Sequence, residues 1–293
     1  MNKFVVTCGS TADFTEERAR EREIAVLPFR FRINEEDYID DFGKNISNKE
    51  FYDRFSKGAN VKTSSVNVGE YVEFFEPYLK EGIDVIHITL SSGLSGSYDY
   101  CLSAKKELEE KYPERKIYVI DSLCGSMGYG MLVEDAADLR DQGKSAAETT
   151  EIIENKRLNI RALYFTADLT AFIKGGRLSA AAGFIGNVLK IVPLLGVTKE
   201  GRLEVKKKLI GKRRAVAELV SEMAKDTLNG NDYDGRCIVG NADAEEDAAI
   251  VVSEIEKVFP KLKGKCVVSE IGPVMGCHCG KGTIAVFFEG KAR

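Results

Sequence analysis

The segment from Asp84 to Lys111 constrains the fold of this chain most strongly, because a loop of small residues joins an apolar run to an amphipathic one. Val85–Leu90 is rich in β-branched residues and predicts a buried strand. From Tyr98 onward, apolar residues recur at helical spacing among lysines and glutamates, which predicts a helix. Ser91–Ser97 lies between the two. The first backbone N–H groups of a helix after such a loop are free to bind an anion. A tight turn with an ordinary serine cap is the alternative.

The composition is that of a globular protein with one large or two ordinary domains. Of 293 residues, 44% are hydrophobic and 30% are charged, and the net charge of -4 argues against nucleic-acid binding. The seven cysteines are scattered, unlike those of a secreted disulfide scaffold. We expect no signal peptide, and no membrane span in the apolar region 180–197, which contains Asn187, Lys190 and Pro193. These features predict a cytoplasmic protein without stable membrane insertion.

The first half of the chain alternates predicted strands and helices, which is the pattern of an α/β fold with a mostly parallel sheet and helices on both faces. Four loops rich in serine and threonine leave strands or enter helices: Ser10–Thr11, Thr63–Ser65, Ser91–Ser97 and Asp121–Ser122. In an open α/β sheet, ligands bind beyond the carboxyl ends of the strands. We therefore expect these loops to converge on a ligand.

The second half has the mixed pattern of an α+β domain. We expect strands near 161–166 and 203–210, a hairpin loop at 198–202, helices over 212–228 and 245–259, and further strands over 236–240, 265–270 and 284–288. The boundary is placed so that residues 1–157 form the N-terminal α/β domain and residues 158–293 the C-terminal domain. The apolar sequence at 180–197 predicts a buried helix and a strand. It also suggests one wall of an apolar cavity for a chain-like ligand, because small residues stand beside large ones.

His278 lies in the most unusual local composition, between Cys277 and Cys279 and among glycines. Adjacent Cys-His-Cys lacks the spacing that lets two thiolates bind one ion, so we predict no metal site. The other histidine, His87, lies in a predicted buried strand, where a hydrogen-bonded core histidine is expected. The glycines at 125–130 do not follow the order of a dinucleotide-binding loop, and we attribute them to close helix packing.

A serine hydrolase acting on an acyl ester is the enzyme alternative. Ser95, in Gly-Leu-Ser-Gly-Ser, nearly matches a nucleophile elbow, and His278 could serve as its base with Asp121 orienting the ring. However, the fifth position is Ser97 rather than glycine, and the loop is longer than a sharp elbow.

The motifs together resemble the DegV family over essentially the whole chain. Five of them occur in the family's order and spacing: Thr63–Ser65, Ser91–Tyr98, Asp121–Ser122, Lys174–Ser179 and Gly272–Gly282. The resemblance implies a bacterial fatty-acid-binding protein that is not itself an enzyme and uses no cofactor. It also implies an N-terminal α/β domain and a C-terminal α+β domain, with a long-chain fatty acid in a tunnel between them. A separate fatty acid kinase would convert the presented fatty acid to an acyl phosphate.

The resemblance also assigns residues. It places the carboxylate of the fatty acid on Thr63 and Ser95, with His278 close by, and Arg177 in docking to the kinase or in the transfer. The neighbouring positions complete the expected ligand-binding set: Ser64, Ser92 and Gly96.

The chain departs from the family pattern in three places. Gly9 stands where the family has an aspartate, before Ser10. Ile210 stands where a second family arginine is expected; the nearby basic residues are Lys212, Arg213 and Arg214. Cysteines on both sides of His278 are also unusual. The resemblance gives neither the acyl chain length nor the oligomeric state.

Overall fold

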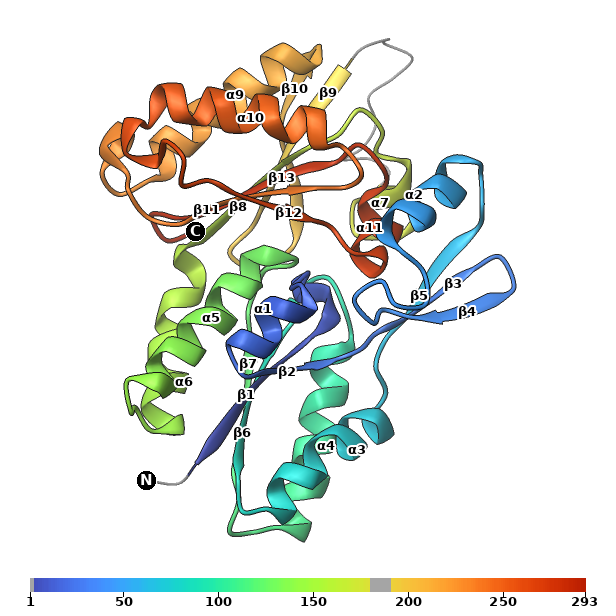
Figure 1. Ribbon diagram of the computed structural model, residues 1–293, viewed down its shortest axis with the longest axis vertical. Coiled ribbons are helices and arrows are strands. Elements are labelled where there is room, and N and C mark those ends of the chain that lie inside the picture. The colour runs from blue at the N-terminus through green and yellow to red at the C-terminus, as the bar shows by residue number, and fades with distance from the viewer. Residues whose placement is uncertain (1–2, 180–190) are drawn as a thin grey trace.

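The first half of the chain contains a parallel sheet between layers of helices. In the computed structural model, which describes residues 3–179 and 191–293, the strand order is β2 (Ile24–Leu27), β1 (Phe4–Gly9), β6 (Asp84–Thr89) and β7 (Ile117–Asp121). Each neighbouring pair in this sheet is parallel. Helices α3 (Val68–Lys80) and α4 (Ser97–Lys111) pack together on one side of it (Figure 1). On the other side lie α1 (Glu16–Glu21), α5 (Met127–Asp141) and α6 (Ala146–Lys156). The predicted α/β architecture is confirmed.

A small antiparallel sheet lies beside this parallel one. Its order is β4 (Glu36–Ile39), β3 (Arg30–Ile33) and β5 (Val61–Ser64), and α2 (Asn48–Ser56) connects β4 to β5. The predicted loop at Thr63–Ser65 was wrong for Thr63 and Ser64, which belong to β5. These residues pair with β3, whose residues Phe31 and Ile33 are buried, and this contact is not visible in the local sequence.

The second half forms a six-stranded mixed sheet. Its order is β10 (Leu203–Ile210), β9 (Ile191–Val197), β8 (Ile160–Phe165), β13 (Ile284–Glu289), β11 (Cys237–Asn241) and β12 (Val267–Glu270). Only β11 and β12 pair in parallel within it. Helices α9 (Lys212–Asp226) and α10 (Glu245–Val258) pack together against this sheet (Figure 1). The predicted α+β half and its 198–202 hairpin are confirmed.

Two short helices of the second half lie toward the first half. They are α7 (Thr170–Lys174) and α11 (Pro273–Cys279), and α11 contacts α2, β3 and β5 (Figure 1). The predicted boundary at residue 157 falls in the 3-10 turn Arg157–Asn159 between α6 and β8, and it stays a prediction. The predicted helix within 180–197 lies outside the described residues, whereas the predicted strand there is β9.

Local signals explain why several elements begin where they do. The predicted caps at Ser47 and Ser145 are confirmed, since each side chain accepts a hydrogen bond from the backbone N–H three residues later.

His87 is the expected core histidine, because its Nδ1 lies 2.8 Å from Thr7 Oγ1 and burial lowers its pKa to about 3. Gly128 confirms the close-packing interpretation, since a methyl group there would lie 2.9 Å from the Phe287 ring. Among the described helices, none is long and apolar enough to cross a membrane.

Candidate functional site

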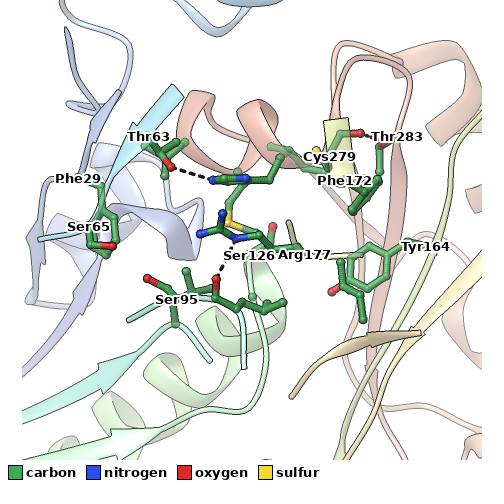
Figure 2. A pocket seen from close by; sticks show the side chains of 18 of the residues that line it. Phe29, Thr63, Ser65, Ser95, Ser126, Tyr164, Phe172, Arg177, Cys279 and Thr283 are labelled. Carbon is green, nitrogen blue, oxygen red and sulfur yellow. Dashed lines mark hydrogen bonds between the residues drawn. The ribbon is translucent and has the colours of Figure 1, made fainter. Parts of the chain in front are cut away.

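The candidate site is centred on a hydrogen bond between the two halves of the chain. Thr63 is on β5 and His278 is on α11, and Thr63 Oγ1 lies 2.8 Å from His278 Nε2 (Figure 2). The close approach of α11 to α7 depends on Gly175, because a methyl group at this position would overlap His278 Nδ1. The sequence-predicted pair Thr63 and His278 is therefore brought together by three elements that are distant in the sequence.

The imidazole of His278 is neutral at physiological pH. Burial lowers its pKa to about 4, and the nearby Arg177 charge acts in the same direction. Its Nδ1 is buried and has no hydrogen-bond partner among the described residues. A buried N–H without an acceptor is costly, so we assign the proton to Nε2, which then donates to Thr63 Oγ1. In this tautomer the Thr63 hydroxyl keeps its own hydrogen for a ligand.

Ser95 lines the same cavity from the loop before α4. Its Oγ lies 2.9 Å from Ser97 Oγ and accepts a hydrogen bond from the Ser97 backbone N–H at 3.2 Å. In the described part of the chain, no hydrogen bond joins Ser95 to His278. Asp121, the residue that would orient the base of a hydrolase, instead accepts hydrogen bonds from Ser92. The relay that a Ser95 nucleophile needs is thus not assembled in this conformation.

The remaining expected ligand-binding residues divide into two groups. Ser64 lines the cavity beside Thr63. Ser92 is exposed and its hydroxyl donates to Asp121 Oδ2 at 2.5 Å, whereas Gly96 is exposed at the start of α4. Neither Ser92 nor Gly96 is among the cavity-lining residues, so the structure places them around the loop that positions Ser95.

Arg177 lies at the edge of the cavity, partly buried. Its Nε donates to the Leu94 carbonyl at 2.9 Å, and its Nη1 donates to the Gly175 carbonyl. Burial lowers the pKa of this guanidinium. No acidic side chain of the described residues pairs with it, so its positive charge is available to an anion. The two carbonyl contacts fix the planar group in one orientation.

The cavity behind these polar groups is apolar. The space between its atoms, including the part open to solvent, is about 760 Å³. Aliphatic, aromatic and sulfur-containing side chains supply most of its wall: Phe29, Leu90, Leu94, Tyr164, Phe172, Leu203, Ile271, Val274, Met275 and Cys279. Gly125 leaves space in the cavity, since a methyl group there would lie 3.1 Å from Met275 Cε and 3.2 Å from Leu90 Cδ1.

A second, more polar hollow adjoins the cavity. Both share Thr63, Ser65, Arg177 and His278 in their walls. The outer hollow is also lined by Asp168 and by three lysines, of which Lys281 pairs with Asp243: Lys62, Lys174 and Lys281. The Thr63–His278 hydrogen bond therefore stands between an apolar interior and a basic exterior. An amphipathic ligand with an acidic head and an apolar tail matches this polarity.

Several site residues gave no recognisable signal in the sequence. Phe29 precedes β3 and its ring packs on Gly9, where a methyl group would lie 2.5 Å from the ring. An aspartate at position 9 would meet this ring, which explains the departure at Gly9. Ser126 also lines the cavity, held by a hydrogen bond to the buried Asp13. Both contacts, Phe29 with Gly9 and Ser126 with Asp13, join residues far apart in the sequence, so no local pattern indicates them.

The other two departures from the family pattern are the cysteines beside His278 and the isoleucine at position 210. Cys277 and Cys279 are buried, and burial raises the pKa of both thiols. Among the described residues, no group of three His, Cys, Asp or Glu side chains is arranged to bind a metal ion. Ile210 ends β10 and is 59% exposed, next to the basic start of α9.

The fold and the site define a class of two-part α/β proteins with an apolar cavity behind a hydroxyl- and histidine-lined mouth. The chain belongs to the DegV family, described as uncharacterised proteins, which matches residues 3–291. A DegV domain-containing protein of Clostridium perfringens is 35% identical over 100% of this chain and 99% of its own length.

Solved structures share the fold. Bacillus subtilis DegV, described as a fatty acid binding protein, has a TM-score of 0.81 and 27% identity, covering 99% of this chain and 100% of its own. The Streptococcus pneumoniae fatty acid kinase B3 protein, loaded with linoleic acid, has a TM-score of 0.84 and 22% identity, with the same coverage.

Proposed function

We propose that this chain is a cytoplasmic, non-enzymatic protein that holds a long-chain fatty acid in a tunnel between its two halves and presents the carboxylate to a fatty acid kinase for conversion to an acyl phosphate. The observation that supports this most directly is the Thr63–His278 pair at the junction of the apolar cavity and the basic hollow. The description of Bacillus subtilis DegV as a fatty acid binding protein, and the linoleic acid in the Streptococcus pneumoniae protein of the same fold, support the ligand class.

The physical chemistry of the site favours a fatty acid over other small anions. About 14 buried methylenes contribute roughly 11 kcal/mol of transfer free energy. Association and ordering offset a large part of that sum, yet firm non-covalent binding remains. Hydrogen bonds from the hydroxyls of Thr63 and Ser95 to the carboxylate add roughly 1.5–3 kcal/mol each and direct the head outward. A carboxylate held by hydroxyls stays nucleophilic toward a phosphoryl donor.

The first experiment is mass spectrometry of solvent extracts of the freshly purified protein. We expect intact long-chain fatty acid from the wild type. The double variant Thr63→Val/Ser95→Ala should retain at least tenfold less, because both donors to the carboxylate are gone. The control Thr150→Val/Ser103→Ala makes the same chemical changes on helix positions away from the cavity, where the hydroxyls bond only to the carbonyls of Ala146 and Asp99. Equal lipid content in the site variant and the control would contradict the carboxylate assignment.

The presentation step is tested separately at Arg177. Its guanidinium has no acidic partner among the described residues and borders both hollows. The Arg177→Gln variant should keep its bound fatty acid, whereas acyl phosphate formation by an added fatty acid kinase and ATP should fall at least tenfold. The variant Arg202→Gln, on the hairpin between β9 and β10, serves as the charge-matched control. Full acyl phosphate formation with Arg177→Gln would contradict a role in docking or transfer.

A further inference from the structure

Two cysteines outside the cavity lie next to each other where strands β11 and β12 begin: Cys237 is the first residue of β11, and Cys266 directly precedes β12. Strands β11 and β12 pair in parallel, with Ile238 opposite Val267. One step earlier in the same register, Cys237 stands opposite Cys266. Neighbouring strands are about 4.8 Å apart, which is within the roughly 4.4–6.8 Å range of Cα separations that disulfides span. Cys237 belongs to the core cluster between this sheet and helices α9 and α10, and Cys266 packs against that cluster.

The two thiols differ in access and in acidity. Cys237 is 2% exposed, whereas Cys266 is partly exposed at the edge of the sheet. A hydrogen bond from the Cys237 thiol lowers the pKa of Cys266, against the opposing effects of burial and the Glu256 charge.

The other thiols lack these properties. All five are buried, and burial raises the pKa of each one: Cys8, Cys101, Cys124, Cys277 and Cys279. A redox-sensitive cysteine combines accessibility and thiolate character with a second cysteine in reach. Among the seven cysteines, Cys266 combines all three.

We propose that Cys237 and Cys266 form a reversible thiol–disulfide site that is oxidised by hydroperoxides, with Cys266 attacking first and Cys237 resolving. The Cys266 thiolate attacks the terminal peroxide oxygen, which breaks the O–O bond, forms a sulfenic acid and releases an alcohol or water after protonation. Cys237 then loses its proton and attacks the sulfenic sulfur, and hydroxide leaves as water. Two thiols lose two electrons and two protons in total, and the peroxide is reduced. The resulting crosslink joins edge strand β12 to β11.

The test uses the full chain, reduced and then treated with hydrogen peroxide in slight molar excess. Remaining thiols are alkylated, and the non-reduced digest is mapped by mass spectrometry. We expect one crosslinked peptide pair that joins Cys237 to Cys266 and disappears after dithiothreitol. Before oxidation, limited alkylation of the folded protein should label Cys266 at least tenfold faster than any other cysteine.

Three variants test the role of each cysteine. Cys266→Ser should abolish the crosslink, Cys237→Ser should leave Cys266 as a sulfenic acid that dimedone labels, and the control Cys101→Ser should crosslink like the wild type. Oxidation of Cys266 without linkage to Cys237 in the wild type, or linkage of another pair, overturns the proposal. If Cys237→Ser fails to fold, the alkylation of the wild type still tests the proposal. Slow labelling of Cys266 in that experiment would overturn it.

Discussion

Asp13 is a buried carboxyl group between the cavity wall and the start of α11. It accepts hydrogen bonds from the Ser126 hydroxyl and, at 3.0 Å, from the Gly272 backbone N–H. Burial raises the pKa of Asp13 to about 8, the nearby Asp40 adds to the rise, and the two hydrogen bonds oppose it. The carboxyl group is therefore largely protonated in the folded protein at neutral pH.

This raised pKa predicts a pH-dependent stability. An unfolded aspartate titrates near about 3.9, so between about pH 4 and pH 8 the folded state binds more protons than the unfolded state. The free energy of unfolding then falls as the pH rises through this window, with a slope for one group of at most about 1.4 kcal/mol per pH unit. Asp13→Asn keeps an acceptor for Gly272 and removes this slope.

Urea unfolding of both proteins from pH 5 to pH 9 measures the effect. The stability of Asp13→Asn relative to the wild type should increase up to about pH 8 and level off above it. Groups that titrate in both proteins without an interaction with Asp13, such as His87, largely cancel in this difference. Parallel curves over the whole range would show that Asp13 ionises normally in the folded protein.

At the scale of single elements, α11 depends on a glycine for its position. Gly276 faces α2, and a methyl group there would lie 2.6 Å from Tyr52 Oη and 2.8 Å from Phe51 Cε1. Both aromatic side chains are almost fully buried, and Tyr52 Oη donates to the Ile271 carbonyl at 2.8 Å. Close approach of α11 and α2 is therefore possible only without a side chain at this position, and this approach also places His278 next to Thr63.

Gly276→Ala should lower the free energy of unfolding by about 1–3 kcal/mol, because overpacking moves α11 or its buried neighbours. Bound fatty acid should decrease with it, since His278 moves too. Gly69→Ala in α3 is the matched control, because this glycine is exposed in a helix and a methyl group there would meet only the Asn67 side chain, at 3.3 Å, so the stability should change by at most about 1 kcal/mol. Equal thermal midpoints for the two variants would contradict the packing argument.

The elements themselves were predictable where the signal is local, and α11 shows the limit. Pro273 at its first position and Gly280 just past its end, with φ of 77°, are both helix-boundary signals. The glycine and the histidine inside this helix, with a glycine directly before and after it, obscured these signals in the sequence. In contrast, the serine cap of α6 and the alternation of strands and helices were read correctly, because each needs only neighbouring residues.

At the scale of the whole molecule, the site could not be derived from local patterns. Thr63 and His278 are 215 positions apart, and they meet only because β5 joins the small antiparallel sheet and α11 packs against it. Hydroxyl-rich loops predicted a binding region, yet the family resemblance was needed to select Thr63, Ser95 and His278. The expected ligand-binding set also included Ser92 and Gly96; neither lines the cavity, and their part in binding stays a prediction.

The two halves are also joined by a network of ion pairs on the side of α5 and α6. Arg236, before β11, contacts Asp135 of α5 at 2.6 Å and Glu289 of β13 at 2.7 Å. Lys156 of α6 contacts the same two carboxylates at 2.9 and 3.1 Å. Burial raises the pKa of Asp135, and the two cations oppose the rise. The network therefore compensates a carboxylate that would be costly to bury alone.

Removing Arg236 should thus destabilise the protein mainly through the carboxylate that it leaves behind. We expect Arg236→Met to lower the free energy of unfolding by about 1–3 kcal/mol, less than for a fully buried pair because the network is partly exposed. Asp135→Asn in the same chain should restore part of this loss, with a coupling energy of about 0.5–2 kcal/mol in a double-mutant cycle. Lys212→Met is the control, since its exposed pair with Asp247 lies within the second half and should contribute at most about 1 kcal/mol. Urea denaturation provides all four values, and strictly additive losses for Arg236 and Asp135 would show that this ion pair does not stabilise the contact between the two halves.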